Sequence, residues 1–261
     1  MFLRSVGEIS LHELNRNYFA NFFCIFTMNI IVTGTSRGIG YALVKKICES
    51  GNHQVVAISR DAARLEMLKY ECQLLNPKAS VFPVGFDLSS SSFSFELLPL
   101  ILSHFEKIDV LINNAGILIK KEFSEFSDDD FDDIFNTNVK SVFKLTRALL
   151  AYFNTPAHIV NISSMGGLQG TSKFPGLSLY SASKAAVAVL TEVMAEEFKD
   201  RKIKVNCLAY GAVQTEMLAH AFPGYTAPLK PDEMASFVAN FALTGHQFFN
   251  GKILPVSLST P

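Results

Sequence analysis

The chain has 261 residues, of which 49% are hydrophobic, so it can bury a core of its own and is not an intrinsically disordered chain. Its 23 Lys and Arg residues nearly balance its 24 Asp and Glu residues, and this even charge argues against nucleic acid as a partner. The four cysteines lie far apart without a Cys-x-x-Cys pair, which favours reduced thiols in a cytoplasmic protein over a disulfide framework or a metal site.

Residues 1–27 differ from the rest of the chain. Charged residues precede an aromatic run that Asn21 interrupts, and no small-residue cleavage site follows, so the segment lacks the pattern of a secretory signal. The apolar stretch from Tyr18 to Val32 is shorter than the about 20 residues of a membrane-spanning helix, which argues against a membrane protein. We expect an extension outside the fold, followed by a single domain at 28–261. An ordered arm that covers an apolar surface of a neighbour is the alternative.

From Met28 onward, short β-rich runs alternate with longer amphipathic segments. Strands are predicted at 29–33, 54–59, 80–86, 109–113, 158–163, 204–208 and 252–256. Helices are predicted at 39–49, 62–75, 93–105, 131–153 and 179–199. This order predicts a doubly wound α/β fold, in which helices cover both faces of a parallel sheet.

A glycine-rich turn follows the first predicted strand, with the sequence Thr33-Gly34-Thr35-Ser36-Arg37-Gly38-Ile39-Gly40. Glycines allow the backbone to approach a pyrophosphate closely, and the N-terminus of the following helix attracts its negative charge. The turn therefore predicts a dinucleotide site whose lining residues are Gly34, Ser36, Arg37, Gly38, Ile39 and Gly40. An ordinary strand-to-helix turn is the alternative.

The residues after the second predicted strand are expected to select the cofactor. An acidic residue there would bind the ribose 2′-hydroxyl of NAD, but this chain has Ser59 and Arg60, with Arg37 in the glycine-rich turn. Two guanidinium groups favour a phosphate dianion, so the sequence predicts NADP(H) unless both arginines are solvated surface residues. Asp87 and Leu88 follow the third strand, where the carboxylate could bind the adenine amino group or cap the next segment.

Tyr180 and Lys184 lie four residues apart in a predicted helix, so their side chains share one face. A phenol with a pKa of about 10 is a poor acid–base group at neutral pH, and a nearby ammonium lowers that pKa toward the working range. Ser163 and Ser164 end the preceding strand, where a hydroxyl could hydrogen-bond a substrate carbonyl. Taken alone, Tyr-x-x-x-Lys is most often a surface pair.

Together these motifs resemble those of the classical short-chain dehydrogenase/reductase family. The resemblance covers roughly Met28 to the C-terminus and rests on the order of the glycine-rich turn, Asn113-Asn114-Ala115-Gly116, Asn138, Ser164 and Tyr180-x-x-x-Lys184. It implies a Rossmann-type fold of about seven parallel strands and a nicotinamide cofactor. It also implies a homodimer or homotetramer that packs through two long helices.

The resemblance further implies the roles of the catalytic residues. Tyr180 is the general acid that protonates the developing alkoxide, and Ser164 polarises and orients the carbonyl. Lys184 lowers the pKa of Tyr180 and holds the nicotinamide ribose, while Asn138 holds a water that links Lys184 to solvent.

The resemblance assigns two further segments to the cofactor. It implies that Asn114, Ala115 and Gly116 line the adenosine and ribose side, although asparagines at such positions often only satisfy backbone groups. After the sixth strand, it places Gly211, Val213 and Thr215 beside the nicotinamide.

Three features depart from the family pattern. Ser164 precedes Tyr180 by more residues than is common, and we place the extra residues in the loop at 170–174, with Ser163 as the rival catalytic serine. The usual Pro-Gly after the sixth strand is Tyr210-Gly211, which makes that loop less rigid. The common Asp-Gly-Gly near the C-terminus is missing.

Apolar residues follow the strands on either side of the predicted catalytic helix: Met165, Leu168, Phe174, Leu177, Met217, Leu218, Phe222, Pro223 and Tyr225. We expect them to line a pocket for an apolar carbonyl compound, unless they pack on each other or at a subunit interface. The favoured function is the NADPH-dependent reduction of a small-molecule ketone or 3-oxoacyl-type substrate. The alternative is a sensor that binds NADP(H) without turnover.

Overall fold

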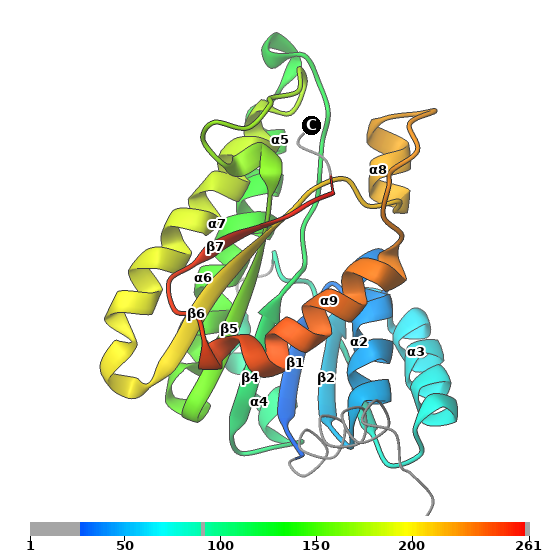
Figure 1. Ribbon diagram of the computed structural model, residues 1–261, viewed down its shortest axis with the longest axis vertical. Coiled ribbons are helices and arrows are strands. Elements are labelled where there is room, and N and C mark those ends of the chain that lie inside the picture. The colour runs from blue at the N-terminus through cyan, green and yellow to red at the C-terminus, as the bar shows by residue number, and fades with distance from the viewer. Residues whose placement is uncertain (1–26, 90–91, 259–261) are drawn as a thin grey trace, which may run out of the picture.

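The computed structural model describes residues 27–89 and 92–258. In this part of the chain, seven strands form one parallel sheet in the order β3-β2-β1-β4-β5-β6-β7 (Figure 1). The strands are β1 (Asn29–Thr33), β2 (Gln54–Ser59), β3 (Ser80–Gly85), β4 (Ile108–Asn113), β5 (Phe153–Ser164), β6 (Ile203–Tyr210) and β7 (Ile253–Val256). The predicted fold class is therefore confirmed. The expected extension lies, apart from Thr27, outside the described residues.

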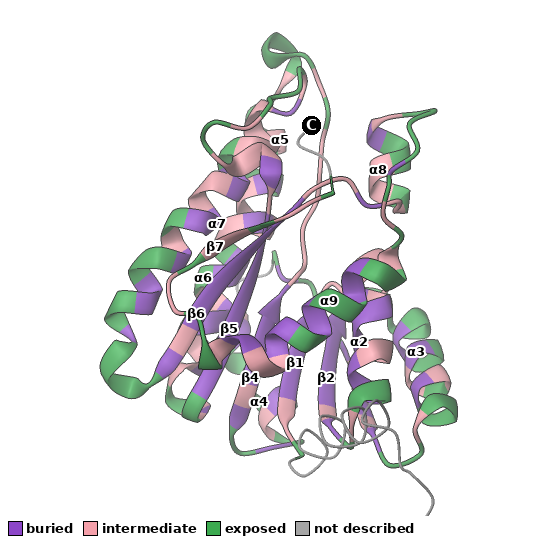
Figure 2. Cartoon of the chain, in the orientation of Figure 1, coloured by how far each residue is buried: buried purple, intermediate pink, exposed green. Residues whose placement is uncertain are grey.

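Helices cover both faces of the sheet (Figure 1). One core contains side chains of α2 (Gly38–Ser50), α3 (Ala62–Leu75) and α9 (Pro231–Thr244). The other core contains side chains of α4 (Leu98–Leu102), α6 (Ser141–Leu149) and α7 (Ser178–Glu197). Ile30 faces the first core and Ile31 the second, which explains why the central strands have apolar residues at successive positions. Figure 2 shows these strands as almost continuously buried.

The long helix expected at 131–153 is interrupted. It begins earlier, as α5 (Asp128–Phe135), because the Ser127 side chain caps its first turn. A π-helical turn (Asn136–Lys140) then separates α5 from α6. The chain leaves the helix before the expected end because Phe153 already belongs to β5 and is buried in the core. Similarly, the helix expected at 93–105 is a π-helical turn (Phe93–Leu97) followed by the short α4.

Two helices were not predicted from the sequence, α8 (Glu216–Ala221) and α9. The N-terminus of α9 carries recognisable signals, because Pro231 occupies its first turn and the Glu233 carboxylate accepts a hydrogen bond from the Lys230 N–H at 2.7 Å. In Figure 1, α8 stands apart from the helices that cover the sheet.

The strand order reverses between β1 and β4, and the loops that follow these two strands are tied together. The Thr33 hydroxyl oxygen accepts hydrogen bonds from the backbone N–H groups of Asn114 and Ala115, both at 3.0 Å. The Asn114 side chain donates to the Thr33 carbonyl oxygen at 2.9 Å. In open α/β sheets, ligands bind at such a switch point, beyond the carboxyl ends of the strands.

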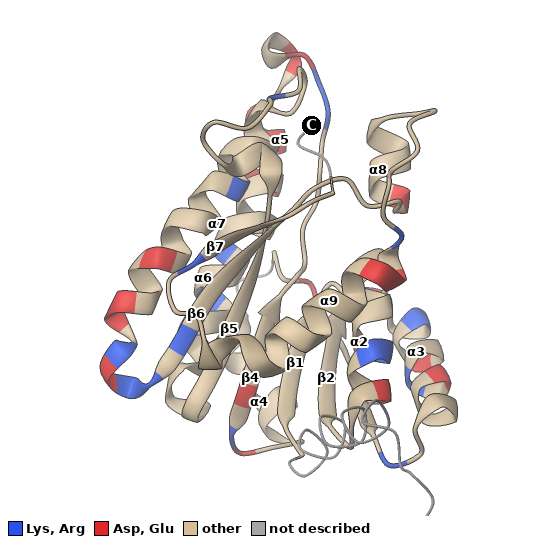
Figure 3. Cartoon of the chain, in the orientation of Figure 1, with Lys and Arg blue, Asp and Glu red and all other residues tan. Residues whose placement is uncertain are grey.

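Charged positions of both signs are scattered over the helices and loops, while most strand positions are uncharged (Figure 3). Among the described residues, Cys48, Cys72 and Cys207 are free and buried, and no group of three His, Cys, Asp or Glu could hold a metal ion. The fourth cysteine, Cys24, lies outside this part of the chain. Within the same described ranges, no helix is long and apolar enough to cross a membrane.

Candidate active site

A cleft of about 740 Å³ opens at the carboxyl edge of the sheet. It is lined by all the residues expected to bind the cofactor: Gly34, Ser36, Arg37, Gly38, Ile39, Gly40, Ser59, Arg60, Asp87, Leu88, Asn114, Ala115, Gly116, Tyr180, Lys184, Gly211, Val213 and Thr215. Ser164 also lines it, whereas Asn138 is buried behind the wall. The fold thus gathers residues that are far apart in the sequence around one cleft.

In the glycine-rich turn, the backbone at Gly34 has a conformation and surroundings that only glycine fits. Gly34 has a φ of +73°, and a Cβ there would lie 2.7 Å from the Cα of Ala115. A Cβ on Gly40 would lie 2.2 Å from the Gly34 carbonyl oxygen, so the start of α2 packs tightly on the turn. No side chain caps this helix N-terminus, which leaves its first N–H groups for a ligand in the cleft. The turn therefore fits a pyrophosphate.

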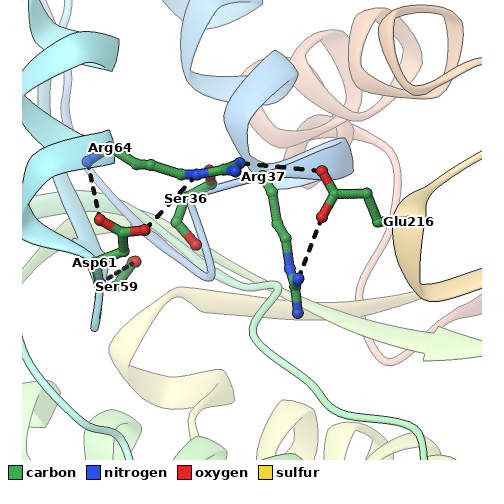
Figure 4. A network of polar contacts seen from close by, with 6 residues as sticks. All are labelled: Ser36, Arg37, Ser59, Asp61, Arg64 and Glu216. Carbon is green, nitrogen blue, oxygen red and sulfur yellow. Dashed lines mark hydrogen bonds and ion pairs between the residues drawn. The ribbon is translucent and has the colours of Figure 1, made fainter. Parts of the chain in front are cut away.

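The first turn of α3 contributes a cation to the cleft that the sequence analysis did not single out. The Asp61 carboxylate accepts a hydrogen bond from the Arg64 N–H at 3.0 Å and so begins α3. Arg64 also lines the cleft, with its Nη1 atom 3.5 Å from the Ser36 carbonyl oxygen and its Nε atom 3.6 Å from Asp61 Oδ2 (Figure 4). The signal that could have identified Arg64 is its position in the first turn of the helix that Asp61 caps, just after β2.

A carboxylate lies between two of the arginines. Glu216, the first residue of α8, has its Oε2 atom 3.2 Å from Arg37 Nη1 and its Oε1 atom 4.0 Å from Arg64 Nη1 (Figure 4). Sequence reasoning also missed Glu216, because nothing in the local sequence connects a residue after β6 with the turn after β1. Only the fold brings them together.

Asp87 performs the capping role that was one of its two expected roles. Its Oδ1 atom accepts hydrogen bonds from the N–H and the hydroxyl of Ser89, at 2.9 Å and 2.8 Å. The Ser89 N–H is the main cause that lowers the pKa of Asp87, and the nearby Arg60 lowers it further. Asp87 is therefore a carboxylate at neutral pH, held at the wall of the cleft.

The Asn113–Gly116 segment is anchored on both sides. Asn113 donates a hydrogen bond to the Asn161 side chain of β5 at 2.8 Å, and Asn161 donates to the Thr191 hydroxyl of α7 at 2.9 Å. All three side chains are buried. Asn113 thus satisfies buried polar groups, while its neighbours Asn114 to Gly116 line the cleft.

Tyr180 and Lys184 lie in the first turns of α7, with Lys184 Nζ 5.8 Å from the centre of the Tyr180 ring. Lys184 donates a hydrogen bond to the Ile162 carbonyl oxygen at 2.9 Å. Burial lowers the pKa of this lysine to about 8. The Lys184 ammonium therefore lies near the Tyr180 ring and lines the same cleft.

The pKa of Tyr180 shifts in the direction opposite to the one expected. Burial raises this pKa, and a hydrogen bond with the Ser164 side chain only partly opposes the shift. The physical reason is that burial disfavours the charged phenolate. In this structure Tyr180 is therefore a neutral phenol at neutral pH.

The geometry separates the two candidate serines. Ser163 is buried and donates its hydroxyl proton to the Lys184 carbonyl oxygen at 2.7 Å, so it braces β5 against α7. Ser164 follows at the end of β5, and its hydroxyl hydrogen-bonds Tyr180. Ser164 is therefore the better placed of the two to contact a substrate together with Tyr180.

Asn138 lies in the π-helical turn, next to Lys184 but with its side chain engaged elsewhere. Its Oδ1 atom accepts a hydrogen bond from the Ile117 N–H at 2.8 Å, and its Nδ2 atom donates to the Ser183 hydroxyl at 3.0 Å. A Cβ on Gly116 would lie 3.3 Å from both Asn138 Oδ1 and Lys184 Nζ. The side chain of Asn138 therefore fixes the loop after β4 around the lysine.

The outer part of the cleft is apolar. Of the residues expected there, Met165, Phe174, Leu177, Met217, Leu218, Phe222 and Tyr225 line the cleft, whereas Leu168 and Pro223 do not. The rings of Phe174 and Phe222 meet edge to face at 5.9 Å. Lys120 donates to the Ala221 carbonyl oxygen at 3.0 Å, with its Nζ atom 4.2 Å from the centre of the Phe222 ring, and so holds the C-terminal end of α8.

The sequence matches the family model of short chain dehydrogenases over residues 28–226. It is 29% identical over 238 residues to a 3-oxoacyl-(acyl-carrier-protein) reductase of Thermotoga maritima. The alignment covers 87% of this chain and 94% of that protein. A solved short-chain dehydrogenase of Burkholderia cenocepacia, in complex with NADP, is 26% identical with a TM-score of 0.79. A 3-ketoacyl-(acyl-carrier-protein) reductase of Brucella melitensis, complexed with NADH, is 28% identical with a TM-score of 0.77. Each structural match covers 88% of this chain and 96% of the other.

Proposed function

Because this chain belongs to the short-chain dehydrogenase/reductase family of oxidoreductases, we propose that it uses NADPH to reduce the carbonyl group of a ketone or 3-oxoacyl-type substrate. The observation that carries this proposal is the meeting of Ser164, Tyr180 and Lys184 in one cleft. The glycine-rich turn and a group of apolar side chains line the same cleft.

The cleft residues fit a dinucleotide. The glycine cradle and the uncapped N-terminus of α2 would hold the pyrophosphate, and Asn114, Ala115 and Gly116 would line the ribose side. Arg37 and Arg60 would hold a 2′-phosphate, with Arg64 close by. This concentration of guanidinium groups supports NADP(H) over NAD(H).

The catalytic residues act on the substrate carbonyl oxygen. When bound, the reduced nicotinamide supplies the hydride. The Ser164 hydroxyl donates a hydrogen bond to the carbonyl oxygen, and Tyr180 transfers its proton to that oxygen as negative charge develops there. The raised pKa of Tyr180 keeps this residue protonated before the reaction, which is the form that a general acid requires. The Lys184 ammonium then stabilises the phenolate that remains. Asn138, through the loop after β4, holds the surroundings of Lys184 and would support a water that returns the proton.

The pocket supports an apolar carbonyl substrate. Its wall is formed by aromatic and aliphatic side chains from the loop before α7 and from α8. Such a wall stabilises an acyl chain or a hydrophobic ketone by burial and offers little to a phosphorylated sugar. The relatedness to 3-oxoacyl-(acyl-carrier-protein) reductases agrees with this substrate class.

The experiment that tests the proposal measures the oxidation of NADPH with a panel of ketones, diketones and 3-oxoacyl thioesters. We expect turnover with NADPH to exceed turnover with NADH. Arg60→Ala should raise the Kd of NADPH about tenfold and leave that of NADH nearly unchanged. Tight NADPH binding without reduction of any compound would instead support the sensor.

We also propose that two copies of the chain pack through the long helices. Phe143 of α6 and Val189 and Val193 of α7 are large apolar residues with exposed fractions of 45%, 59% and 50%. Contact between copies would bury them. Light scattering should give a dimer or tetramer for the native chain and a smaller species for Val193→Lys.

A further inference from the structure

Glu216 occupies an unusual position for a carboxylate in a proposed phosphate site. It lies between Arg37, at the N-terminus of α2, and Arg64, on α3, at 3.2 Å and 4.0 Å (Figure 4). Arg64 also pairs with Asp61 at 3.6 Å. Two guanidinium groups and two carboxylates therefore neutralise one another at this end of the cleft.

This neutralisation has a direct consequence for the cofactor. A 2′-phosphate dianion can bind both guanidinium groups only if the Glu216 carboxylate leaves them, because like charges at such distances repel. A cofactor with a 2′-hydroxyl carries no charge at that position and does not compete with Glu216. Binding of NADP(H) therefore requires that the Glu216 carboxylate leave the two arginines, whereas binding of NAD(H) does not.

Glu216 also belongs to the wall of the substrate pocket. It is the first residue of α8, and the next two residues, Met217 and Leu218, line the cleft. The other end of α8 is held separately, by the Lys120 hydrogen bond to the Ala221 carbonyl oxygen at 3.0 Å. Release of Glu216 would therefore remove the ion pairs that tie the N-terminal end of α8 to α2 and α3, while the Thr215 cap of this helix would remain.

We propose that Glu216 is a specificity-determining residue that acts as the resident counter-ion of Arg37 and Arg64. The 2′-phosphate of NADP(H) displaces its carboxylate and thereby loosens the N-terminal end of α8 at the substrate pocket. Glu216 thus lowers the affinity for NADP(H) while it links the choice of cofactor to the position of α8. This inference rests on the proposed NADP(H) preference.

The expected change in the Kd of NADPH is small because the side chains of this ion pair are exposed to solvent. The Arg37 and Glu216 side chains are 60% and 61% exposed, so solvent screens their attraction and the displaced carboxylate is readily hydrated. A second hollow of about 490 Å³, lined by Arg37, Arg64 and Glu216 among others, gives the carboxylate room to move. We therefore expect a change of about fivefold in Kd rather than a loss of binding.

The test compares Glu216→Gln with the native chain by calorimetric titration of NADPH and NADH. The variant should bind NADPH about fivefold more tightly at low salt, with the Kd of NADH unchanged. Raising the salt concentration should reduce the difference between variant and native chain. Glu106→Gln is the matched control, because Glu106 is an exposed carboxylate just before β4, at the opposite edge of the sheet. Arg37→Gln combined with Glu216→Gln should remove most of the gain, since the two changes act on one ion pair.

The outcomes separate this inference from the proposed function. If the native chain prefers NADPH and Glu216→Gln leaves both affinities unchanged, the counter-ion role is wrong and the cofactor assignment stands. If the native chain does not prefer NADPH but the variant does, the role of Glu216 is supported and the cofactor preference is wrong. If the native chain does not prefer NADPH and Glu216→Gln also leaves both affinities unchanged, the role of Glu216 and the cofactor assignment are both wrong. Thermal unfolding of Glu216→Gln shows whether it folds, and Glu216→Ala repeats the test if it does not.

Discussion

The Ser164 side chain hydrogen-bonds Tyr180 in the cleft, while the hydroxyl of the adjacent Ser163 donates a hydrogen bond to the Lys184 carbonyl oxygen at 2.7 Å. Two consecutive serines at the end of β5 therefore serve different purposes. Ser163 fixes the first turns of α7 on the sheet, and Ser164 lines the cleft together with the phenol of Tyr180. The alternation of side chains along the strand separates these purposes.

Replacement of Tyr180 by Phe removes the proposed proton donor and keeps the ring. We expect kcat/KM to fall about 100- to 10,000-fold, the usual contribution of a general acid, while the Kd of NADPH stays within about twofold. Stopped-flow kinetics and cofactor titration measure the two quantities. Full activity in the variant would show that another group protonates the carbonyl oxygen.

Lys184 predicts how activity depends on pH. Burial lowers its pKa to about 8, so the ammonium is present below that pH and is lost as the pH rises through it. Because the ammonium stabilises the phenolate of Tyr180, kcat/KM for NADPH in the reduction should fall above about pH 8. This ratio reports groups of the free enzyme. A flat profile up to pH 10 would contradict the assigned role.

Gly34→Ala tests the close approach of the glycine-rich turn. Its φ of +73° and the 2.7 Å distance from its added Cβ to Ala115 Cα both oppose a side chain, so we expect a loss of roughly 2–4 kcal/mol in the free energy of unfolding. Gly170→Ala is the matched control, because Gly170 has a φ of +79° but no atom within 4 Å of the added Cβ. It should cost only the backbone strain, about 1–2 kcal/mol. Urea unfolding of both variants makes the comparison, and equal losses would show that the Ala115 contact is unimportant.

His158 predicts a loss of stability in mild acid. It is buried, and its Nδ1 atom donates to the Ala242 carbonyl oxygen at 2.9 Å while its Nε2 atom accepts from the Asn206 side chain at 3.1 Å. This pattern suits only the neutral ring, and burial lowers the pKa of His158 to about 4. The unfolded chain binds the proton first, so the stabilisation present above about pH 6.5 is lost as the pH falls toward 4.

The expected loss is on the order of 3 kcal/mol by pH 4, measured by urea unfolding at a series of pH values. His158→Gln should show a smaller dependence on pH between 6.5 and 4. His220→Gln, at an exposed position of α8, should retain the full dependence of the native chain. If His158→Gln has the same pH dependence as the native chain, other groups cause the acid sensitivity.

The sequence predicts those elements best whose signals are local. The bounds of β1 and β2 agree with the structure, because their apolar runs end at polar or turn-forming residues. The start of α3 also agrees, because the Asp61 cap is a local interaction. By contrast, the helix expected at 131–153 ends before Phe153, since burial of that side chain in the core of the sheet outweighs its helical spacing. The Pro231 and Glu233 signals of α9 were present but were not used.

The sequence by itself determined the fold class, because β-rich runs alternate with amphipathic segments along the chain. It also determined the glycine-rich turn and the placement of Tyr180 and Lys184 on one helix face, because each depends on spacing within a few residues. Tertiary structure alone decided which serine faces Tyr180, the direction in which the pKa of Tyr180 shifts, and the position of Glu216 between two arginines. These properties depend on burial and on distances between segments far apart in the chain. Local patterns do not give the distances between such segments, since packing of the sheet and its helices sets them.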